Sequence, residues 1–217
     1  MTLVDYFGDW LNVINIKELE KVISAINYIY KRKIVVPNYS DIFKAFTLCS
    51  LHDCKVVFLG QDPYPQKDIA TGIAFGNKLG TIDLSPSLQV IKNSVLNPYE
   101  VFDETLESWG KQGILMLNSA LTCEVNNIGS HIMLWRPFIA KLLQNMSFYD
   151  TGLVYVLWGS QAQTFEPYIG KNNHILKHKH PAWYVRNNIP LPSSIFDEIN
   201  KILINNYGTP IKWCADL

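Results

Sequence analysis

The stretch Val56-Val57-Phe58-Leu59-Gly60-Gln61-Asp62-Pro63-Tyr64 joins an apolar run to a group of turn-forming and polar residues. An unbroken run of apolar, β-branched residues predicts a strand buried on both faces, as in a parallel sheet. Gly60 ends the run, and Pro63 fixes the backbone and removes a ladder donor. Asp62 is therefore expected at the carboxyl end of a core strand, where open α/β sheets bind their ligands. For this residue taken alone, a plain Asp-Pro turn is the simpler interpretation.

The rest of the chain alternates between strand and helix patterns. Strands are predicted at residues 55–59, 114–118, 153–158 and 174–177, and helices at 18–32, 88–96, 102–112, 135–146, 160–168 and 193–206. Ser85-Pro86 predicts an N-cap followed by proline in the first turn, and Gly113 predicts a C-cap. This alternation predicts an α/β fold with a central four-stranded parallel sheet flanked by helices on both faces.

The 217 residues fit one domain better than two small ones. Within a single domain spanning residues 1–217, we expect a helical N-terminal part at about 1–50 and an α/β core at about 51–217. With 48% apolar and 18% charged residues, the chain is typical of a globular protein.

Charge is unevenly distributed although the formal net charge is zero. No acidic residue lies between Glu166 and Asp197, a segment that contains Lys171, Lys177, Lys179, Arg186 and three histidines. One interpretation is a basic face that could bind an anionic partner, and the other is an ordinary solvated surface.

The four cysteines form no Cys-x-x-Cys pair. Cys49, His52 and Cys54 have no matching second half for a zinc site, so reduced, buried thiols are expected. The first residues do not resemble a signal peptide, and no apolar run of about twenty residues predicts a membrane span. We therefore expect a cytoplasmic protein with no membrane partner, or a nuclear one if its source is eukaryotic or viral.

Polar residues also follow the other predicted strands: Asn118, Gly159-Ser160 and His180-Pro181. Taken singly, each has a structural interpretation: a capping amide, a helix N-cap and a structural histidine. Together with Asp62 they predict a site at one edge of the sheet. The chain has no Gly-x-Ser-x-Gly, Walker lysine or His-Glu-x-x-His motif. A carboxylate, an amide and a histidine suit cleavage at an anomeric carbon, because the cation-like transition state is stabilised by a nearby anion.

Seven motifs in a fixed order make the chain resemble the family 1 uracil-DNA glycosylases from about residue 36 to 213. They are residues 60–64 (GQDPY), 72–75 (GIAF), 85–88 (SPSL), 112–118 (QGILMLN), 157–163 (LWGSQAQ), 180–181 (HP) and 209–213 (TPIKW). The resemblance implies a monofunctional enzyme that flips uracil out of single- or double-stranded DNA and hydrolyses its N-glycosidic bond, the first step of base excision repair. It also implies a monomer that needs no metal or organic cofactor, with an inhibitor protein that mimics DNA as a candidate further partner.

The resemblance also implies roles for individual residues. Asp62 would orient water and stabilise the sugar cation, and His180 would hydrogen-bond the uracil O2 as negative charge develops there. Asn118 would read the O4 and N3 edge of uracil, and the backbone at Gln61-Asp62 would add donors. Phe75 would stack on the base, and Tyr64 would occupy the space that a thymine methyl group needs.

The resemblance also implies contacts with DNA phosphates, and the chain differs from the family pattern at three places. Ser85, Pro86, Ser87, Gly159 and Ser160 match the loops that grip phosphates. Pro65 stands where the family usually has histidine, and residues 189–192 (IPLP) replace a Phe-Phe-Gly stretch.

The third departure is the wedge loop, which reads HPAWYVR at residues 180–186. By position Tyr184 replaces the intercalating leucine, and we expect it to contact DNA with Trp183 and Arg186. Surface packing of the two aromatic residues is the alternative. The departures leave a second hypothesis for the chain: a catalytically weak DNA-binding module that acts as a replication or partner-binding subunit.

Overall fold

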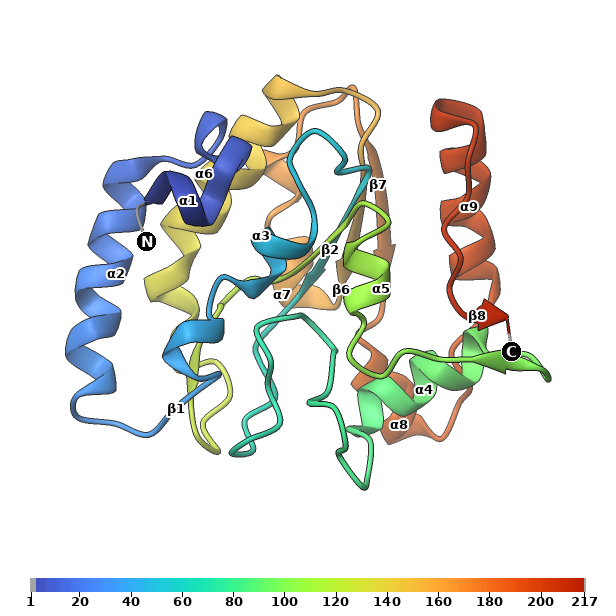
Figure 1. Ribbon diagram of the computed structural model, residues 1–217, viewed down its shortest axis with the longest axis horizontal. Coiled ribbons are helices and arrows are strands. Elements are labelled where there is room, and N and C mark those ends of the chain that lie inside the picture. Colours follow the sequence, from blue (N-terminus) through green and yellow to red (C-terminus); the bar gives the residue numbers. More distant parts are fainter. Residues whose placement is uncertain (1–2, 217) are drawn as a thin grey trace.

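The computed structural model describes residues 3–216. Its central sheet has the strand order β4-β2-β6-β7, formed by β2 (Val56–Gly60), β4 (Ile114–Asn118), β6 (Val154–Trp158) and β7 (His174–His178). All neighbouring pairs are parallel. The predicted fold class is therefore confirmed, and the carboxyl ends of the strands share one edge, at the bottom of Figure 1.

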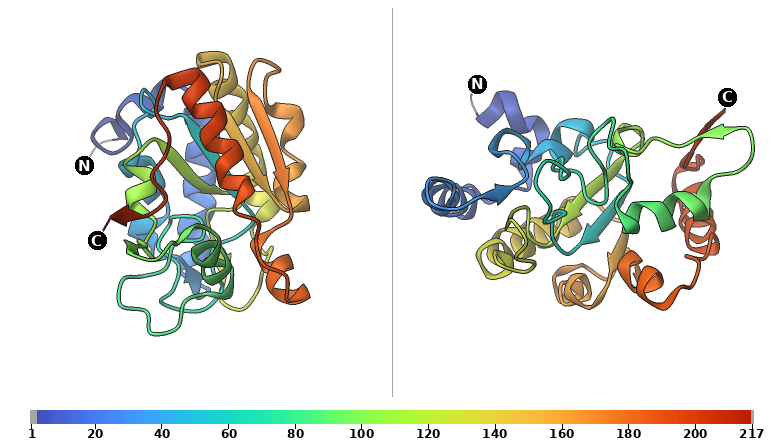
Figure 2. Two further views of the ribbon diagram at one scale, coloured as in Figure 1. Left: turned by 90° about the vertical axis from the view of Figure 1, so that its right-hand side faces the viewer. Right: turned by 90° about the horizontal axis from the view of Figure 1, so that it is seen from below.

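Helices cover both faces of the sheet (Figures 1 and 2). Alternate strand residues such as Val57 and Leu59 face a core formed with α1 (Leu3–Phe7), α2 (Ile16–Tyr30), α3 (Lys44–Leu48), α6 (Ile132–Tyr149) and α7 (Ser160–Gln163). The others, such as Val56 and Phe58, face a core formed with α4 (Pro86–Val95), α5 (Glu107–Gly110), α8 (Pro181–Asn187) and α9 (Ser194–Tyr207). Burial on both faces explains the unbroken apolar runs in the strands.

The remaining elements are short, and of them only η3 lies in a segment that was predicted to be helical. They are the 3-10 helices η1 (Gly8–Asn12), η2 (Tyr39–Asp41) and η3 (Glu166–Tyr168), and the paired strands β1 (Val35–Val36) with β5 (Cys123–Glu124) and β3 (Glu100–Val101) with β8 (Ala215–Asp216). In the part of the chain that the structure describes, no helix is both long and apolar enough to cross a membrane.

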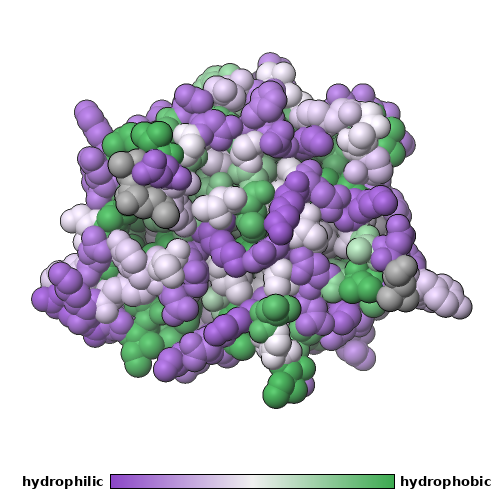
Figure 3. All heavy atoms as spheres, viewed as in Figure 1, coloured by the Kyte–Doolittle hydropathy of each residue, from purple (hydrophilic) through white to green (hydrophobic). Residues whose placement is uncertain are grey.

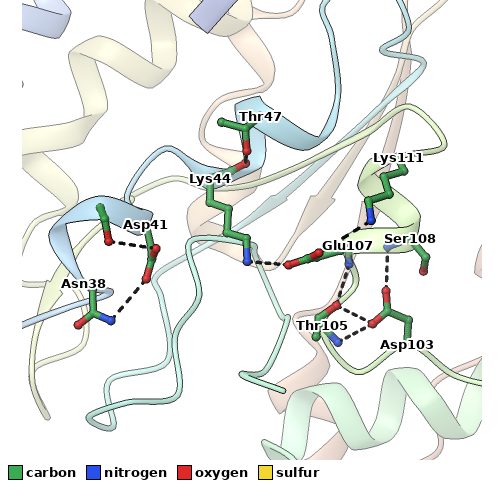
Figure 4. Close-up of polar contacts among 10 residues, drawn as sticks. Asn38, Asp41, Lys44, Thr47, Asp103, Thr105, Glu107, Ser108 and Lys111 are labelled. Atoms are coloured by element: carbon green, nitrogen blue, oxygen red, sulfur yellow. Dashed lines mark hydrogen bonds and ion pairs between the residues drawn. The ribbon is translucent and has the colours of Figure 1, made fainter. Parts of the chain in front are cut away.

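Two predicted helices are much shorter than expected. The segment predicted at 160–168 is divided into α7 and η3. The segment at 102–112 is helical only in α5, because a turn held by Asp103 precedes it (Figure 4). The Asp103 carboxylate accepts hydrogen bonds from the Thr105 backbone and hydroxyl and from the Ser108 amide, at 2.9, 2.6 and 2.8 Å. Partial burial alone would raise the pKa of Asp103, but these hydrogen bonds give a net lowering.

An ion pair links α3 to α5 beside the edge strand β4. The Lys44 ammonium lies 2.6 Å from the Glu107 carboxylate (Figure 4). Gly72 passes directly beneath this region: a Cβ there would lie 1.7 Å from the Asp41 carbonyl oxygen, and its φ is +81°. Only glycine fits this close approach, which fixes the course of the segment leading to Phe75.

Candidate active site

The sheet register brings the predicted site residues to one edge. Gly60 of β2 is paired with Asn118 of β4, and Trp158 of β6 is paired with His178 of β7. The segments that leave these strands carry Asp62, Gly159 and His180.

Gly60 lies in close contact with two predicted uracil contacts, Asn118 and Phe75. A Cβ at this position would lie 2.4 Å from the Asn118 Oδ1 atom and 3.1 Å from the Phe75 ring. Asn118 is 8% exposed, so its amide is held at a buried strand end. The missing side chain at Gly60 therefore gives the amide and the ring their space beside each other.

Phe75 is held in an unusual conformation by its neighbours. Its φ is +66°, which is uncommon for a bulky residue and costs free energy. The Tyr64 hydroxyl donates a hydrogen bond to the Phe75 carbonyl at 2.9 Å. The ring centroid lies 5.6 Å from that of His180 and 6.2 Å from that of Trp158. Strain of this kind persists only where the surroundings impose it, as they often do at ligand sites.

Tyr64 connects the predicted uracil pocket with the predicted phosphate loop. Burial raises the pKa of its phenol, and hydrogen bonding with Ser85 and with the Leu88 backbone offsets only part of that rise. The Tyr64 side chain is therefore neutral at physiological pH, and its hydrogen bond to Phe75 fixes its position at the side of the predicted pocket.

Asp62 has one carboxylate oxygen that the protein leaves uncommitted. Its Oδ2 atom accepts a hydrogen bond from Gln61 Nε2 at 2.8 Å. Its Oδ1 atom is buried and has no hydrogen-bond partner among the described residues. Burial raises the pKa of Asp62, although the hydrogen bond from Gln61 and the nearby Gly129 backbone amide act in the opposite direction. The free oxygen can accept a proton or a hydrogen bond, or stabilise a nearby positive charge.

His180 is held as a neutral hydrogen-bond donor. It is the N-cap of α8, and its Nδ1 atom accepts the Ala182 amide proton at 3.1 Å. An accepting Nδ1 places the ring proton on Nε2. Burial, reinforced by the positive charge of Arg186, lowers the pKa of His180 from 6.5 to about 4. Gly159 allows this position, since a Cβ there would lie 2.9 Å from the His180 Cβ.

The predicted phosphate loops both lead into helices at this edge. Ser85 is the N-cap of α4, with Pro86 in its first turn, but the Ser85 side chain makes no capping hydrogen bond. Ser87, in the first turn of α4, is 7% exposed. Gly159, with φ +90°, precedes Ser160 at the start of α7, whose side chain is exposed. Helix N-termini offer free amide donors for phosphate oxygens.

The predicted wedge segment differs most from expectation, because it folds into the helix α8. Tyr184 packs in the core and is only 9% exposed. Trp183 is half-buried, with the Lys179 ammonium 5.8 Å from its ring centroid. Val185 is 37% exposed and Arg186 is exposed. The exposed residues of α8 are thus Val185, Arg186 and Asn187, and Trp183 packs partly buried against the core.

The segment after α8 also has a mixed role. Asn188 ends the helix in the left-handed conformation with φ +52°. Leu191 is 4% exposed and belongs to the core, whereas Ile189 is 45% exposed. Residues 189–192 therefore anchor the end of α8 as well as bordering the site.

The sequence analysis did not identify the loop at residues 125–131, between β5 and α6, which lies against Asp62 and Pro65. The Asn126 amide donates to the Pro65 carbonyl at 3.0 Å. Behind this loop, Trp135 Nε1 donates to the Thr122 hydroxyl at 2.8 Å, which lies 2.8 Å from His131 Nδ1. His131 is 4% exposed, and burial lowers its pKa. In the sequence, Ser130 and His131 could have indicated a site in this loop, but neither directly follows a predicted strand.

The described residues 3–216 contain no group of three or more histidine, cysteine or acidic side chains that could hold a metal ion. The described cysteines are all free thiols.

Comparison with known proteins identifies the family. The model of the uracil DNA glycosylase superfamily matches residues 46–204. The chain belongs to this superfamily. It is 35% identical over 214 residues to the uracil-DNA glycosylase of Buchnera aphidicola, covering 94% of this chain and 97% of that protein. It is also 35% identical over 193 residues to the uracil-DNA glycosylase of Campylobacter jejuni, covering 87% and 83% of the two chains.

Solved glycosylase structures have the same fold. The crystal structure of mimivirus uracil-DNA glycosylase superposes with a TM-score of 0.76, covering 98% of this chain and 93% of that one at 24% identity. A substituted form of the mimivirus enzyme, solved in complex with UGI, superposes with the same TM-score at 25% identity, covering 98% and 94% of the chains.

Proposed function

We propose that this protein is a uracil-DNA glycosylase that hydrolyses the bond between uracil N1 and the deoxyribose C1′, the first step of base excision repair. The observation that carries this proposal is the convergence of three groups at one sheet edge. They are a carboxylate with a free oxygen (Asp62), a buried amide (Asn118) and a neutral imidazole that donates through Nε2 (His180).

The pocket at Gly60 suits an extruded uracil ring. The base would stack against Phe75 with its edge at Asn118, because both residues lie beside Gly60. The Asn118 amide can donate to O4 and accept from N3–H. Cytosine has an amino group and an unprotonated nitrogen at these positions, so its binding would leave buried polar groups unsatisfied. Tyr64, fixed through the Phe75 carbonyl, excludes the thymine methyl group.

The charges of the site match those of the transition state. When the N1–C1′ bond breaks, the electron pair leaves with the base, so the sugar becomes positive and uracil O2 becomes negative. The Asp62 carboxylate stabilises the sugar cation, and His180 Nε2–H donates to O2. Water adds at C1′ and transfers a proton to Asp62, which releases it to solvent, and the departing uracil anion takes up one proton from solvent to leave as free base.

Backbone amides and basic side chains would hold the DNA. The N-termini of α4 and α7 can bind phosphates on either side of the extruded nucleotide. Lys179 and Arg186 are exposed beside His180, in the segment that lacks acidic residues. These contacts explain binding of single- and double-stranded DNA, because phosphate contacts do not depend on base sequence. The same face is where an inhibitor protein that mimics DNA would bind.

A catalytically weak DNA-binding module is not favoured by this arrangement. Such a module needs the phosphate contacts but not a buried carboxylate with a free oxygen or a strained stacking ring. Maintaining those groups costs free energy that binding alone does not recover.

The test is uracil release from an oligonucleotide with a single uracil, in EDTA, with matched thymine and cytosine oligonucleotides. The proposal predicts release of free uracil from single- and double-stranded DNA and no release from the other two. Tight DNA binding without uracil release would contradict it and favour the module.

A further inference from the structure

The loop between Phe75 and Ser85 projects from the edge of the sheet that holds the site. Its base is fixed, because the Asn77 amide donates to the Glu104 carbonyl at 2.9 Å and Gly76 packs against the Thr105 carbonyl. The part of the loop farthest from its base is a turn, in which the Lys78 carbonyl accepts the Thr81 amide proton at 3.1 Å. The loop is therefore anchored to the rest of the fold near Asn77, and a turn orders the part that projects from the fold.

This loop ends in two exposed aliphatic side chains, Leu79 and Ile82, here called the aliphatic tip. Leu79 is 83% exposed and Ile82 is 97% exposed, so neither contributes appreciably to a core. The loop is the lowest part of the ribbon in Figure 1, and hydrophobic atoms project at the same place in Figure 3. Both side chains keep apolar surface in water that a partner could bury.

The tip is continuous with two predicted nucleotide contacts. Phe75, the predicted stacking ring, precedes the loop, and Ser85, at the predicted phosphate-binding end of α4, follows it. Tyr64 holds the first of these ends, because its hydroxyl donates a hydrogen bond to the Phe75 carbonyl at 2.9 Å. A DNA strand held at α4 with its uracil against Phe75 would therefore bind at the end of the molecule from which the tip projects (Figure 1).

We propose that Leu79 and Ile82 form an apolar DNA contact that packs against the nucleotides flanking the extruded uracil. The inference rests on the proposed function and extends it to a surface that α8 does not supply. Base extrusion leaves a gap in the stack and costs a few kcal/mol, which an apolar side chain in the minor groove can offset. Tyr184, which by sequence position would fill that gap, is buried.

The charge around the tip favours an apolar contact over a phosphate contact. Lys78 and Asp83 flank the two aliphatic residues and have opposite charges. The tip therefore adds no net charge, and its contribution to binding should be nearly independent of salt. A phosphate contact would instead increase the salt dependence by about one released counterion.

The experiment replaces both residues of the tip and measures DNA binding. Leu79→Ser/Ile82→Ser is made in the Asp62→Asn background to prevent turnover, and Kd is measured by fluorescence anisotropy on duplex and single-stranded oligonucleotides with one uracil. We expect duplex Kd to rise about tenfold. We expect a smaller rise on single strands, because they have no minor groove, and an unchanged slope of log Kd against log salt.

Two single substitutions serve as controls. Phe148→Ser removes a side chain that is 78% exposed in the last turn of α6, at the opposite end of that helix from the His131 loop. It should leave Kd unchanged. Lys78→Ala removes a charge from the same loop and should change the salt slope, not the preference for duplex. Melting curves confirm that each variant is folded.

Equal duplex Kd for the double variant and its parent would overturn the proposal, as would an equal loss in Phe148→Ser or a loss that disappears at high salt. Failure of the proposed function would look different, because the unsubstituted protein would then release no uracil at all. A native protein that releases uracil, with a double variant that binds DNA like its parent, rejects only the tip.

Discussion

The predicted uracil pocket and the helix α8 border the same edge of the sheet, but they are built differently. Part of the pocket is set by paired strand ends, because the register places Gly60 opposite Asn118. Which side chains of α8 are exposed is decided by packing: Tyr184 joins the core, Trp183 packs partly buried against it, and Val185 is exposed. A site element fixed by sheet register can thus be located from sequence, whereas one fixed by side-chain packing cannot.

The largest effect should come from the pocket's charged group. Asp62→Asn removes the anion that stabilises the sugar cation, and we expect the single-turnover rate of uracil release to fall about 1,000-fold. Uracil-DNA binding should not weaken, because Asn keeps the shape of the side chain. A rate within tenfold of the native protein would show that the carboxylate is not the catalytic group.

A smaller effect should follow from adding a side chain at Gly60. Gly60→Ala places a Cβ 2.4 Å from Asn118 Oδ1, so the amide must move, and we expect kcat/KM for uracil to fall about 100-fold. The matched control is Gly208→Ala, at the C-cap of α9, where a Cβ meets no atom within 4 Å and φ is +74°. The control should lower stability by about 1 kcal/mol without changing the rate. Similar kinetics for the two variants would refute the role of Gly60.

The third prediction separates the two aromatic residues of α8. Tyr184→Ala should lower the free energy of unfolding by about 2–3 kcal/mol, because it leaves a cavity in the core. Trp183→Ala should change stability much less and raise the Kd for DNA about tenfold, because it removes a stacking surface. Thermal melts and anisotropy measure both quantities. A stable Tyr184→Ala variant with a specific loss of DNA binding would restore Tyr184 as the wedge.

The smallest effect on kcat/KM is expected from a change of pH near neutrality. The folded-state pKa of His180 is lowered from 6.5 to about 4, so its contribution to stability is complete above pH 6.5 and is lost as pH falls toward 4. The kcat/KM profile should therefore show no inflection near pH 6.5 from this residue, and its acid limb should follow Asp62, whose pKa burial raises above 3.8. An inflection near pH 6.5 that is absent in His180→Gln would contradict a neutral His180.

Particular residues show how far the sequence could be interpreted. The strand ends at Gly60 and Asn118 were predictable, because apolar runs buried on both faces stop sharply at a glycine or an amide. The turn at Asp103 was not predictable, because the residues around Trp109 have helical spacing. The spacing does not reveal that the Asp103 side chain forms hydrogen bonds with backbone amides that compete with helix formation.

The loop against Asp62 and Pro65 also escaped sequence analysis. It is held by contacts between distant residues, such as Asn126 with Pro65 and Trp135 with Thr122. No periodicity records such contacts, so the Gly129 backbone near Asp62 could not be anticipated.

The most direct test of the central claim is a crystal structure of the protein with free uracil. We predict the base against Phe75 beside Gly60, with the Asn118 amide at O4 and N3 and His180 Nε2 within hydrogen-bond distance of O2. Uracil bound elsewhere, or reversed so that His180 faces O4, would contradict the assignment of this edge as the uracil pocket.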